Sequence, residues 1–547
     1  MTTTGAGPAA APERPTVPEM HPQRWGDPAR ATALPEATAG LVELAFGHHE
    51  TPAVADPRPP APRLDPGLLD DLRAVVGEAH VLCDDATRRL RTRGKSTPDL
   101  LRARAGDLSD APDAVVRPGD HDEVQAVLDW AVEHRVALVP FGGGTSVTGG
   151  LVARRDGLAG VVSLDLVRMK RLVALDPVSR TATLEPGLRG PEAEALLAAE
   201  GFTLGHFPQS FEFASIGGFA ATRSSGQSSA GYGRFDAMVV GLTAATPRGR
   251  LDLGSSPANA AGPDLRQLLL GSEGALGVVT AVTVRVRPVP EEKAYEGWHW
   301  PSFEAGQTAM RTLAQAGQLP TVLRLSDEHE TVLNLARPDA IGADGSEGAD
   351  GDGAPGGGCL MITGYEGTPA AVARRRDEVT EVLTALGGRR LGTDPGEAWT
   401  HGRFDAPYLR DSMLDAGVLV ETMETATFWS RVPALYAAVR AALVASLGEQ
   451  AIVLCHVSHV YETGCSLYFT VAAPAGDAPL ERWLAAKSAA SDAMLDQGAT
   501  ITHHHAVGTD HKPWLAREVG PVGVELLRAL KAAADPTGVL NPGVLVP

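Results

Sequence analysis

The sequence predicts an α+β fold, and the pattern of residues 111–290 is the main reason. Apolar runs rich in β-branched residues, such as 161–166 and 278–286, indicate strands. Turn residues at 176–180 and 247–249 join neighbouring runs into hairpins, and amphipathic helical segments lie between them. Hairpins pair strands antiparallel, so we expect mixed strands and helices and not a doubly wound parallel sheet.

The individual elements follow from local signals. Helical spacing predicts short helices at 68–76 and 99–104. Asp120 is the expected N-cap of the next helix, because Glu123 three residues later completes a capping box. Gly201 should end a helix over 191–200. The strands that we expect lie at 136–139, 161–166, 172–175, 181–184, 238–245, 250–253, 278–286 and 466–470.

Changes of composition divide the chain into five parts. Residues 1–20 are rich in Ala, Pro and Thr and should form a flexible tail. A helical segment is expected at 21–110, the first α+β domain at 111–290, a second α+β domain at 291–480 and a helical C-terminal segment at 481–547. Within the second domain, residues 339–358 are dominated by Gly, Ala and Asp and should be a disordered loop.

Composition excludes several classes of protein. The 547 residues carry a net charge of -19, which argues against nucleic-acid binding because phosphate neutralisation needs clustered Lys and Arg. The four cysteines suit neither a zinc site nor a disulfide framework, as expected in a reducing cytosol. We find no signal-peptide pattern and no apolar run of the roughly 18 residues that a spanning helix needs. A cytoplasmic protein is expected, and peripheral membrane contact stays open.

The first glycine-rich loop follows the apolar run 136–139. Glycine reaches positive φ and has no Cβ, so its backbone N–H groups can approach phosphate oxygens. A single loop of this kind is often only a tight turn. The predicted cofactor-binding residues of this loop are Phe141, Gly142, Gly143, Gly144, Thr145, Ser146 and Val147.

Two more loops rich in small residues follow in the same domain. Together, three such loops at strand edges favour a site for one large dinucleotide over three separate turns. The second loop system contributes Gln209, Ser210, Phe211, Glu212, Phe213, Ala214, Ser215, Thr222, Arg223, Ser224 and Ser225. The third contributes Glu273, Gly274, Ala275, Leu276, Gly277, Val278 and Val279.

The spacing of these glycines is not that of the Rossmann fingerprint. The three loops resemble instead the PCMH-type FAD-binding domain of the vanillyl-alcohol oxidase / p-cresol methylhydroxylase flavoproteins. That resemblance implies FAD, with the first loop around the pyrophosphate, the second along the ribityl chain and flavin, and the third near the adenine end and ring. Some relatives bind FAD covalently through His or Cys. The first loop has neither, so we expect non-covalent FAD.

His503, His504 and His505 are the strongest catalytic candidates. Imidazole titrates near neutral pH, so three in a row at a turn suit proton abstraction, although a surface cluster is the alternative. Consecutive strand residues point to opposite faces, so all three cannot easily bind one metal ion, and we expect no metal. Tyr468, on a predicted strand, could contact substrate or relay a proton, or could be an ordinary packed aromatic residue.

Arg410 lies in the run Tyr408-Leu409-Arg410-Asp411. It could form only an ion pair with Asp411, or its guanidinium could grip a phosphate or carboxylate.

In chain order, the arginine, tyrosine and histidine elements resemble the alkylglycerone-phosphate synthase branch of the same superfamily, over about residues 21–547. The resemblance implies a cap domain over the flavin, with Arg410 as the ligand of the substrate phosphate and Tyr468 as an active-site residue. It makes the three histidines the catalytic motif and adds Arg324, in 323–327, as a substrate-binding residue. Ala506 stands where that family has glycine.

The implied reaction is the exchange of the acyl group of acyl-dihydroxyacetone phosphate for a fatty alcohol, which makes an ether lipid by a redox-neutral flavin-adduct mechanism. The implied partner is a lipid substrate, and a homodimer stays open. The alternative is an FAD-linked D-2-hydroxy-acid dehydrogenase or oxidase of the lactate or glycolate type. Those enzymes carry a metal-linked His/Glu set, and here His504 stands where their second motif has Glu.

Overall fold

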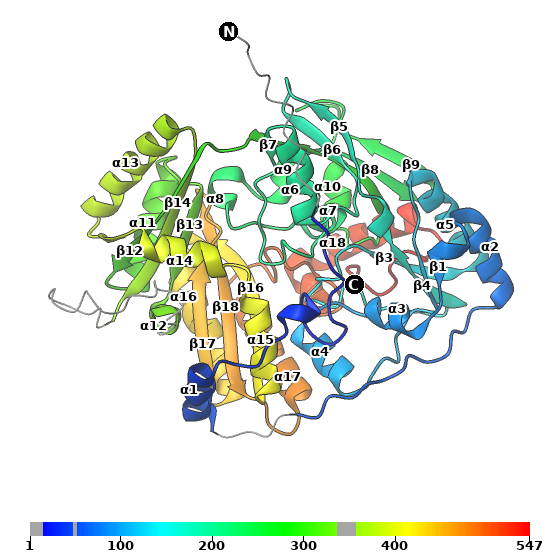
Figure 1. Ribbon diagram of the computed structural model, residues 1–547, viewed down its shortest axis with the longest axis horizontal. Helices are drawn as coiled ribbons and strands as arrows, with labels where there is room; N and C mark the ends of the chain where they lie inside the picture. Colours follow the sequence, from blue (N-terminus) through cyan, green and yellow to red (C-terminus); the bar gives the residue numbers. More distant parts are fainter. Residues whose placement is uncertain (1–14, 48–51, 336–356) are drawn as a thin grey trace, which may run out of the picture.

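The computed structural model describes residues 15–47, 52–335 and 357–547, and these form two α+β units that meet along the middle of the molecule (Figure 1). The α+β prediction is confirmed. Most of the predicted loop 339–358 lies outside the described residues. Among the helices that are described, none is both long and apolar enough to cross a bilayer.

The first unit contains a four-stranded sheet of order β1-β2-β4-β3. β2, β4 and β3 run parallel, and β1 is antiparallel to β2. Its strands are β1 (Val81–Leu82), β2 (Ala114–Val116), β4 (Gly160–Asp165) and β3 (Val136–Phe141). Three helices accompany them: α2 (Pro66–Val76), α3 (Asp85–Leu90) and α5 (His121–His134). Asp120 caps α5 as predicted, because its carboxylate accepts the Glu123 N–H at 2.9 Å. The second half of the predicted capping box differs, because the Glu123 carboxylate accepts the Gly119 N–H at 2.7 Å and not that of Asp120.

The second sheet of this unit is antiparallel, with the order β5-β6-β10-β8-β9. Both predicted hairpins are confirmed, since β5 pairs with β6 and β8 pairs with β9. The strands are β5 (Leu172–Asp176), β6 (Thr181–Leu184), β10 (Val278–Arg285), β8 (Val239–Thr246) and β9 (Gly249–Leu253), with the short pair β7 (Phe202–Thr203) and β11 (Arg287–Pro288). The helices are α6 (Gly190–Ala199), α7 (Ile216–Thr222), α8 (Ser229–Tyr232), α9 (Phe235–Met238) and α10 (Arg266–Leu269).

The second unit is built on a seven-stranded antiparallel sheet of order β15-β12-β14-β13-β17-β18-β16. Its strands are β12 (Glu292–Trp300), β13 (Val322–Ser326), β14 (Cys359–Gly367), β15 (Arg389–Gly392), β16 (Val418–Phe428), β17 (Ile452–Val457) and β18 (Gly464–Pro474). Its helices are α11 (Phe303–Gln315), α12 (Glu328–Leu335), α13 (Pro369–Ala385), α14 (Asp394–Gly402), α15 (Ala406–Asp415), α16 (Val432–Leu447) and α17 (Pro479–Asp496).

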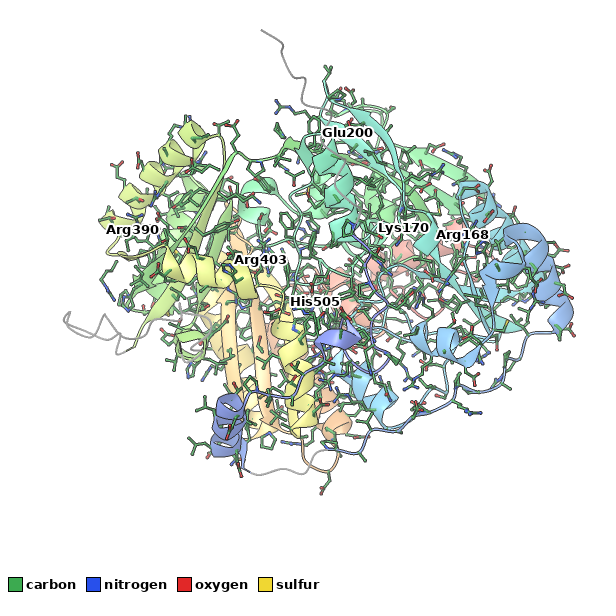
Figure 2. The ribbon with its side chains drawn as sticks, in the orientation of Figure 1. Arg168, Lys170, Glu200, Arg390, Arg403 and His505 are labelled. Carbon is green, nitrogen blue, oxygen red and sulfur yellow. The ribbon has the colours of Figure 1, made fainter. Side chains whose placement is uncertain are left out.

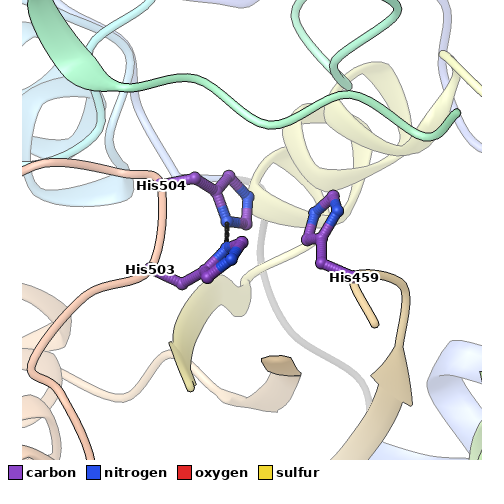
Figure 3. Close-up of side chains that lie close together, drawn as sticks. All are labelled: His459, His503 and His504. Atoms are coloured by element: carbon purple, nitrogen blue, oxygen red, sulfur yellow. Dashed lines mark hydrogen bonds between the residues drawn. The ribbon is translucent and has the colours of Figure 1, made fainter. Parts of the chain in front are cut away.

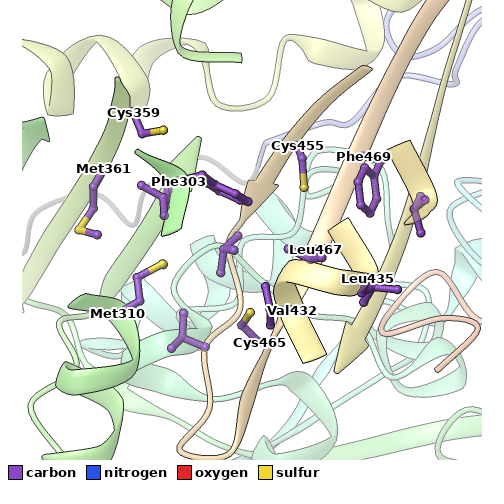
Figure 4. Packing of buried hydrophobic residues seen from close by; sticks show 14 of the residues in the cluster. Phe303, Met310, Cys359, Met361, Val432, Leu435, Cys455, Cys465, Leu467 and Phe469 are labelled. Atoms are coloured by element: carbon purple, nitrogen blue, oxygen red, sulfur yellow. The ribbon is translucent and has the colours of Figure 1, made fainter. Parts of the chain in front are cut away.

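The core of the second unit lies between this sheet and its helices (Figure 4). Leu467 and Phe469 on β18 are fully buried against Val432 and Leu435 of α16. Three of the four cysteines, Cys359, Cys455 and Cys465, are buried free thiols in the same core. Tyr468, between two buried neighbours, faces the other side of the sheet, because strand side chains alternate.

The ends of the chain bind the two units together. α1 (Glu36–Phe46) packs against β16 through Phe46, and α4 (Thr97–Arg104) also contacts α17 and β16. α18 (Lys512–Ala534) bends at Gly520, and the chain then returns to pair Leu540 with Leu138 of β3. Residues 15–20 differ from the expected flexible tail, since Met20 is buried and the Glu19 carboxylate pairs with Arg91.

Candidate functional site

The three predicted loops meet at one place in the first unit. A Cβ on Gly143 would stand 2.7 Å from the Cα of Ala214, so the first loop lies directly against the second. The third loop reaches both: Glu273 N–H donates to Ala221 O, and the Asn541 side chain bridges Glu273 O and Gly150 O. The three loops, of which the first and third lie more than 100 positions apart in the sequence, thus form one continuous surface.

The first loop has the donors that a pyrophosphate requires. From Gly143 to Thr148, no backbone N–H donates a hydrogen bond to any described residue. Beside this loop, a pocket is lined by the basic side chains of Arg91, Lys95 and Arg189. Backbone N–H groups without a partner among the described residues, next to basic side chains, are a suitable binding site for a dinucleotide phosphate. The residues present therefore fit FAD.

In the second loop, one buried polar group has no partner in the described part of the chain, whereas other side chains contact neighbouring residues. Gln209 Nε2 is buried and has no hydrogen-bond partner among the described residues, so it is available to a ligand. Phe211 stacks on Phe404 with centroids 5.6 Å apart. Phe213 packs against Trp25 at 5.8 Å, and Glu212 pairs with Arg30 at 2.9 Å.

The polar side chains around α7 bond mainly to the protein. Ser215 caps α7 by accepting Gly218 N–H, and Thr222 donates to Gly218 O within the helix. Arg223 donates to Leu270 O at 2.9 Å and so ties α7 to the third loop. Ser224 bonds to buried His206 at 3.0 Å, and Ser225 bonds to His459 of the second unit at 3.0 Å.

The third loop lies mostly in the core. Ala275, Leu276, Val278 and Val279 are all buried. Glu273 does not face open space: its carboxylate accepts the N–H groups of Val507 at 3.0 Å and Gly508 at 2.8 Å. The predicted cofactor residue therefore holds the turn that follows the three histidines.

The turn that carries the three histidines, residues 502–508, lies between the two units. In the second unit, Glu424 of β16 accepts the backbone N–H groups of all three histidines. In the first unit, Thr148 donates its hydroxyl to His505 O at 3.1 Å and accepts Thr509 N–H at 3.0 Å. The histidine motif is thus held directly against the first glycine loop, with His505 near the middle of the molecule (Figure 2).

Ala506 strains this turn. Its φ is 73°, in the left-handed region that favours glycine, which is the residue expected at this position.

The three imidazoles meet further polar groups from the second unit. His503 bonds to Tyr461 Oη at 2.6 Å, and its Nδ1 lies 2.9 Å from His504 Nδ1, so one of these two ring nitrogens carries the proton. His459 stacks on His503 with centroids 4.9 Å apart (Figure 3). Burial lowers the pKa of His503 and His459 well below the ordinary value and that of His505 to about 3. These three rings are therefore neutral bases.

Figure 3 also shows the group of side chains that could hold a metal. His459, His503 and His504 each offer one ring nitrogen within 4.8 Å of the others. His505 is not part of this group, but the neighbours His503 and His504 both are, because residues 503–505 form a turn and not a strand. Three imidazoles suit Zn²⁺ or a similar transition metal.

Tyr468 faces the histidines from β18. Its ring stacks on His456 with centroids 4.8 Å apart and lies 5.6 Å from the ring of His505 and 6.1 Å from that of His504. Burial raises the pKa of Tyr468 to about 12, so the phenol keeps its proton at neutral pH.

Arg324 belongs to a buried ionic network behind Tyr468. It pairs with Glu330, and its Nη2 lies 3.0 Å from His456 Nδ1. Burial alone would raise the pKa of Glu330, but His456 and Arg324 lower it to about 2. The network therefore holds His456, the stacking partner of Tyr468, in place.

Arg410 is buried on α15. Its Nε bonds to Asp411 Oδ1 at 3.2 Å and its Nη1 to Lys95 O at 2.7 Å. Nη2 lies 3.1 Å from Asp411 Oδ1 but makes no hydrogen bond with a described residue. Arg410 thus forms an ion pair with Asp411 and also has one N–H donor, Nη2, without a hydrogen-bond partner among the described residues. That donor is available to an anion.

Four groups of this site were missed by the sequence prediction: Glu424, His459, Tyr461 and Glu330. His459 and Tyr461 stand in a run of unusual polar residues, 455–466, which was a usable signal. Glu424 and Glu330 have no local signal, since a single Glu in a strand or helix is most often solvated.

Comparisons with known proteins agree with this geometry. A family model described as an FAD binding domain matches residues 112–253, and one described as the C-terminal domain of FAD linked oxidases matches 289–545. The alkyldihydroxyacetonephosphate synthase of Trypanosoma brucei brucei is 36% identical over 90% of this chain and 82% of its own length. That of Dictyostelium discoideum is 32% identical over 93% and 85%.

Solved structures give the same result. An alkyldihydroxyacetonephosphate synthase structure superposes with a TM-score of 0.81 at 29% identity, covering 96% of this chain and 99% of that one. p-Cresol methylhydroxylase, at 17% identity and a TM-score of 0.67, shares the fold, so the PCMH-type prediction is confirmed. The mitochondrial D-lactate dehydrogenase [cytochrome] of Arabidopsis thaliana is 27% identical over 80% of this chain and 74% of its own length.

Proposed function

Since this chain belongs to the alkyldihydroxyacetonephosphate synthase family of FAD-dependent enzymes, we propose that it exchanges the acyl group of an acyl-dihydroxyacetone phosphate for a fatty alcohol. One observation carries the proposal. Thr148, next to the predicted phosphate-binding residues, is bonded to the histidine turn, which supports a position of the imidazoles and Tyr468 beside the FAD. When bound, FAD supplies an electrophilic ring that can hold the three-carbon unit during the exchange without net oxidation.

Binding and orientation of the substrate fall to arginine in this proposal. Arg410 binds the phosphate through its unspent Nη2, because a guanidinium suits phosphate geometry. Arg324 contributes positive charge, although its guanidinium already forms an ion pair with Glu330. A fixed phosphate restricts the three-carbon unit to one orientation, which is a large part of the rate advantage of a bound substrate.

Proton transfer falls to the histidines and Tyr468. A neutral imidazole of the motif accepts the acidic proton beside the substrate carbonyl. The bond between carbon and the acyl oxygen breaks, and the fatty acid leaves with its oxygen. The alcohol oxygen forms the ether bond to the same carbon, and Tyr468 passes the alcohol proton to the departing carboxylate. The imidazolium then returns the abstracted proton to that carbon, so both proton transfers balance. No oxidant is consumed.

The test supplies purified holoenzyme with a palmitoyl ester of dihydroxyacetone phosphate and hexadecanol. Alkyl product is measured by mass spectrometry, and reduction of an artificial acceptor by D-lactate or glycolate is followed in parallel. Ether product without acceptor reduction supports the proposal. Acceptor reduction without ether product would overturn it.

A second candidate is an FAD-linked D-2-hydroxy-acid dehydrogenase or oxidase. Two observations favour it: the 27% identity with D-lactate dehydrogenase, and the histidine group that could hold a metal. The synthase interpretation takes precedence because identity to synthases is higher, at 36% and 32%.

The proposal extends to where the enzyme works. We propose a cytoplasmic enzyme with non-covalent FAD that touches membranes reversibly, because its fatty substrates reside in bilayers. The exposed apolar side chains of Val522 and Leu526, which lie four residues apart on α18 after its bend at Gly520, support such contact. Co-sedimentation with phosphatidylcholine vesicles tests it, and protein that stays entirely in the supernatant would remove the membrane from the proposal.

A further inference from the structure

Glu424 is a buried carboxylate that holds four donors of the histidine turn. Its side chain is 0% exposed. Its oxygens accept the hydroxyl of Thr502 at 2.5 Å and the backbone N–H groups of His503 at 2.6 Å, His504 at 3.2 Å and His505 at 2.9 Å. Every residue of the turn from 502 to 505 is thus bonded to this one side chain.

The same carboxylate faces the imidazole rings. Glu424 Oε2 lies 3.4 Å from His504 Nδ1, and Oε1 lies 4.0 Å from His505 Nδ1. In the β16–β18 ladder, Glu424 is directly opposite Tyr468. Strand partners share a face of the sheet, so Glu424, Tyr468 and the histidines line the same side.

The charge of Glu424 has no basic partner. Within the described part of the chain, no Lys or Arg forms an ion pair with it, and the nearest titratable side chains are the imidazoles of His504 and His505. A buried ion is costly unless hydrogen bonds and nearby partial charges replace its hydration. The N–H groups of the turn provide that replacement, so the carboxylate and the turn hold each other in one geometry.

Four hydrogen-bond donors surround the Glu424 carboxylate, and hydrogen bonds to the charged form of an acid favour that form. An anion beside one nitrogen of an imidazole orients the ring and increases the basicity of the other nitrogen.

We propose that Glu424 is the positioning residue of the histidine motif: it fixes the backbone of residues 503–505 and orients His504 as the ring that accepts the substrate proton. The positioning follows from the contacts alone, whereas the proton transfer rests on the function proposed above.

Glu421 supplies a matched control. It lies three residues earlier on β16 and is also buried, but its carboxylate faces the other way, toward the N–H groups of Thr97 and Thr422. Glu421→Gln therefore removes a buried charge from the same strand without a direct bond to the histidine turn.

The experiment compares Glu424→Gln and Glu421→Gln holoenzymes. For Glu424→Gln we expect unchanged FAD content, a KM within twofold of wild type and a kcat about 100-fold lower, at the lower end of what general base catalysis contributes. For Glu421→Gln we expect a kcat within threefold of wild type. Formate added to Glu424→Ala should restore part of the lost turnover, which a general loss of folding would not allow.

Three results would overturn the proposal: a Glu424→Gln kcat within threefold of wild type, an equal loss in Glu421→Gln, or a loss of FAD in parallel with kcat. If wild-type enzyme makes no ether product, the proposed function fails and the positioning is tested by amide hydrogen exchange. Faster exchange of residues 503–505 in Glu424→Gln alone supports it, and unchanged exchange refutes it.

Discussion

Gly508 offers the sharpest test of the contact between the histidine turn and the FAD-binding loop. Its φ is +58°, and a Cβ at this position would overlap Thr148 O, lie 2.6 Å from Thr148 C and lie 2.9 Å from Thr148 Oγ1. Real Cβ atoms do not approach closer than 3.0 Å. Gly508→Ala must therefore push the turn and the loop apart.

The expected loss has two parts. A left-handed φ on a residue with a Cβ costs about 1 to 2 kcal/mol. The overlap adds a separation of roughly 1 Å between the histidines and the FAD-binding loop, and a shift of that size costs about 100-fold in rate. Gly538→Ala is the matched control, because Gly538 has φ +70° and a Cβ there would meet nothing within 4 Å apart from its own chain neighbours.

The assay measures ether-product turnover, flavin absorbance and thermal unfolding for both variants. Both should lose similar backbone stability, and only Gly508→Ala should lose about 100-fold in kcat. Equal turnover in the two variants would refute the view that the loop contact sets the position of the histidines.

Four further predictions follow from the same site. Burial raises the pKa of Glu273 from 4.5 to about 7, so its contribution to the free energy of unfolding is fully present below pH 4.5 and is lost, by on the order of 3 kcal/mol, as pH rises through 7. The Glu273→Gln variant, measured by denaturant titration, should lack this pH dependence. A pH profile parallel to that of wild type would contradict the prediction. Ala506→Gly should raise the free energy of unfolding by about 0.5 to 1 kcal/mol by relieving the left-handed φ, and a decrease would be the contrary result. Tyr468→Phe should lower kcat about 100-fold with little change in KM, whereas Tyr436→Phe, which removes a hydroxyl bonded to Asp327, should not. Dialysis against EDTA should leave turnover unchanged because the histidines act as bases in the proposed function, and a loss that Zn²⁺ restores would assign the histidine group to a metal.

Much of the fold could be predicted because its signals are local. The hairpins at 176–180 and 247–249 follow from turn residues between β-branched runs, and Asp120 caps its helix through a neighbour three residues away. Glycine loops, consecutive histidines and the Arg410 motif are likewise visible as short strings of residues. Local chemistry was sufficient to point to a dinucleotide and to candidate reacting groups, and the resemblance that these residues carry implied FAD.

Sequence-based predictions were less accurate where the bonding partner of a side chain lies far away in the sequence. Glu273 and Arg223 look like cofactor ligands in a glycine-rich context, but their bonds go to Val507, Gly508 and Leu270. Residues 15–20 resemble a tail by composition, but Glu19 finds a buried arginine 72 positions away. The composition of a segment does not reveal which distant residues the segment contacts in the folded protein.

By itself, the sequence determined the α+β class, the dinucleotide loops and the kinds of side chain available for chemistry, because each depends on residues a few positions apart. Only the tertiary structure decided that Glu424 and Glu273, one from each unit, hold the two ends of the histidine turn. The physical reason is that a buried carboxylate is stable only where folding brings enough N–H donors around it, and those donors lie 79 and 235 residues away along the chain.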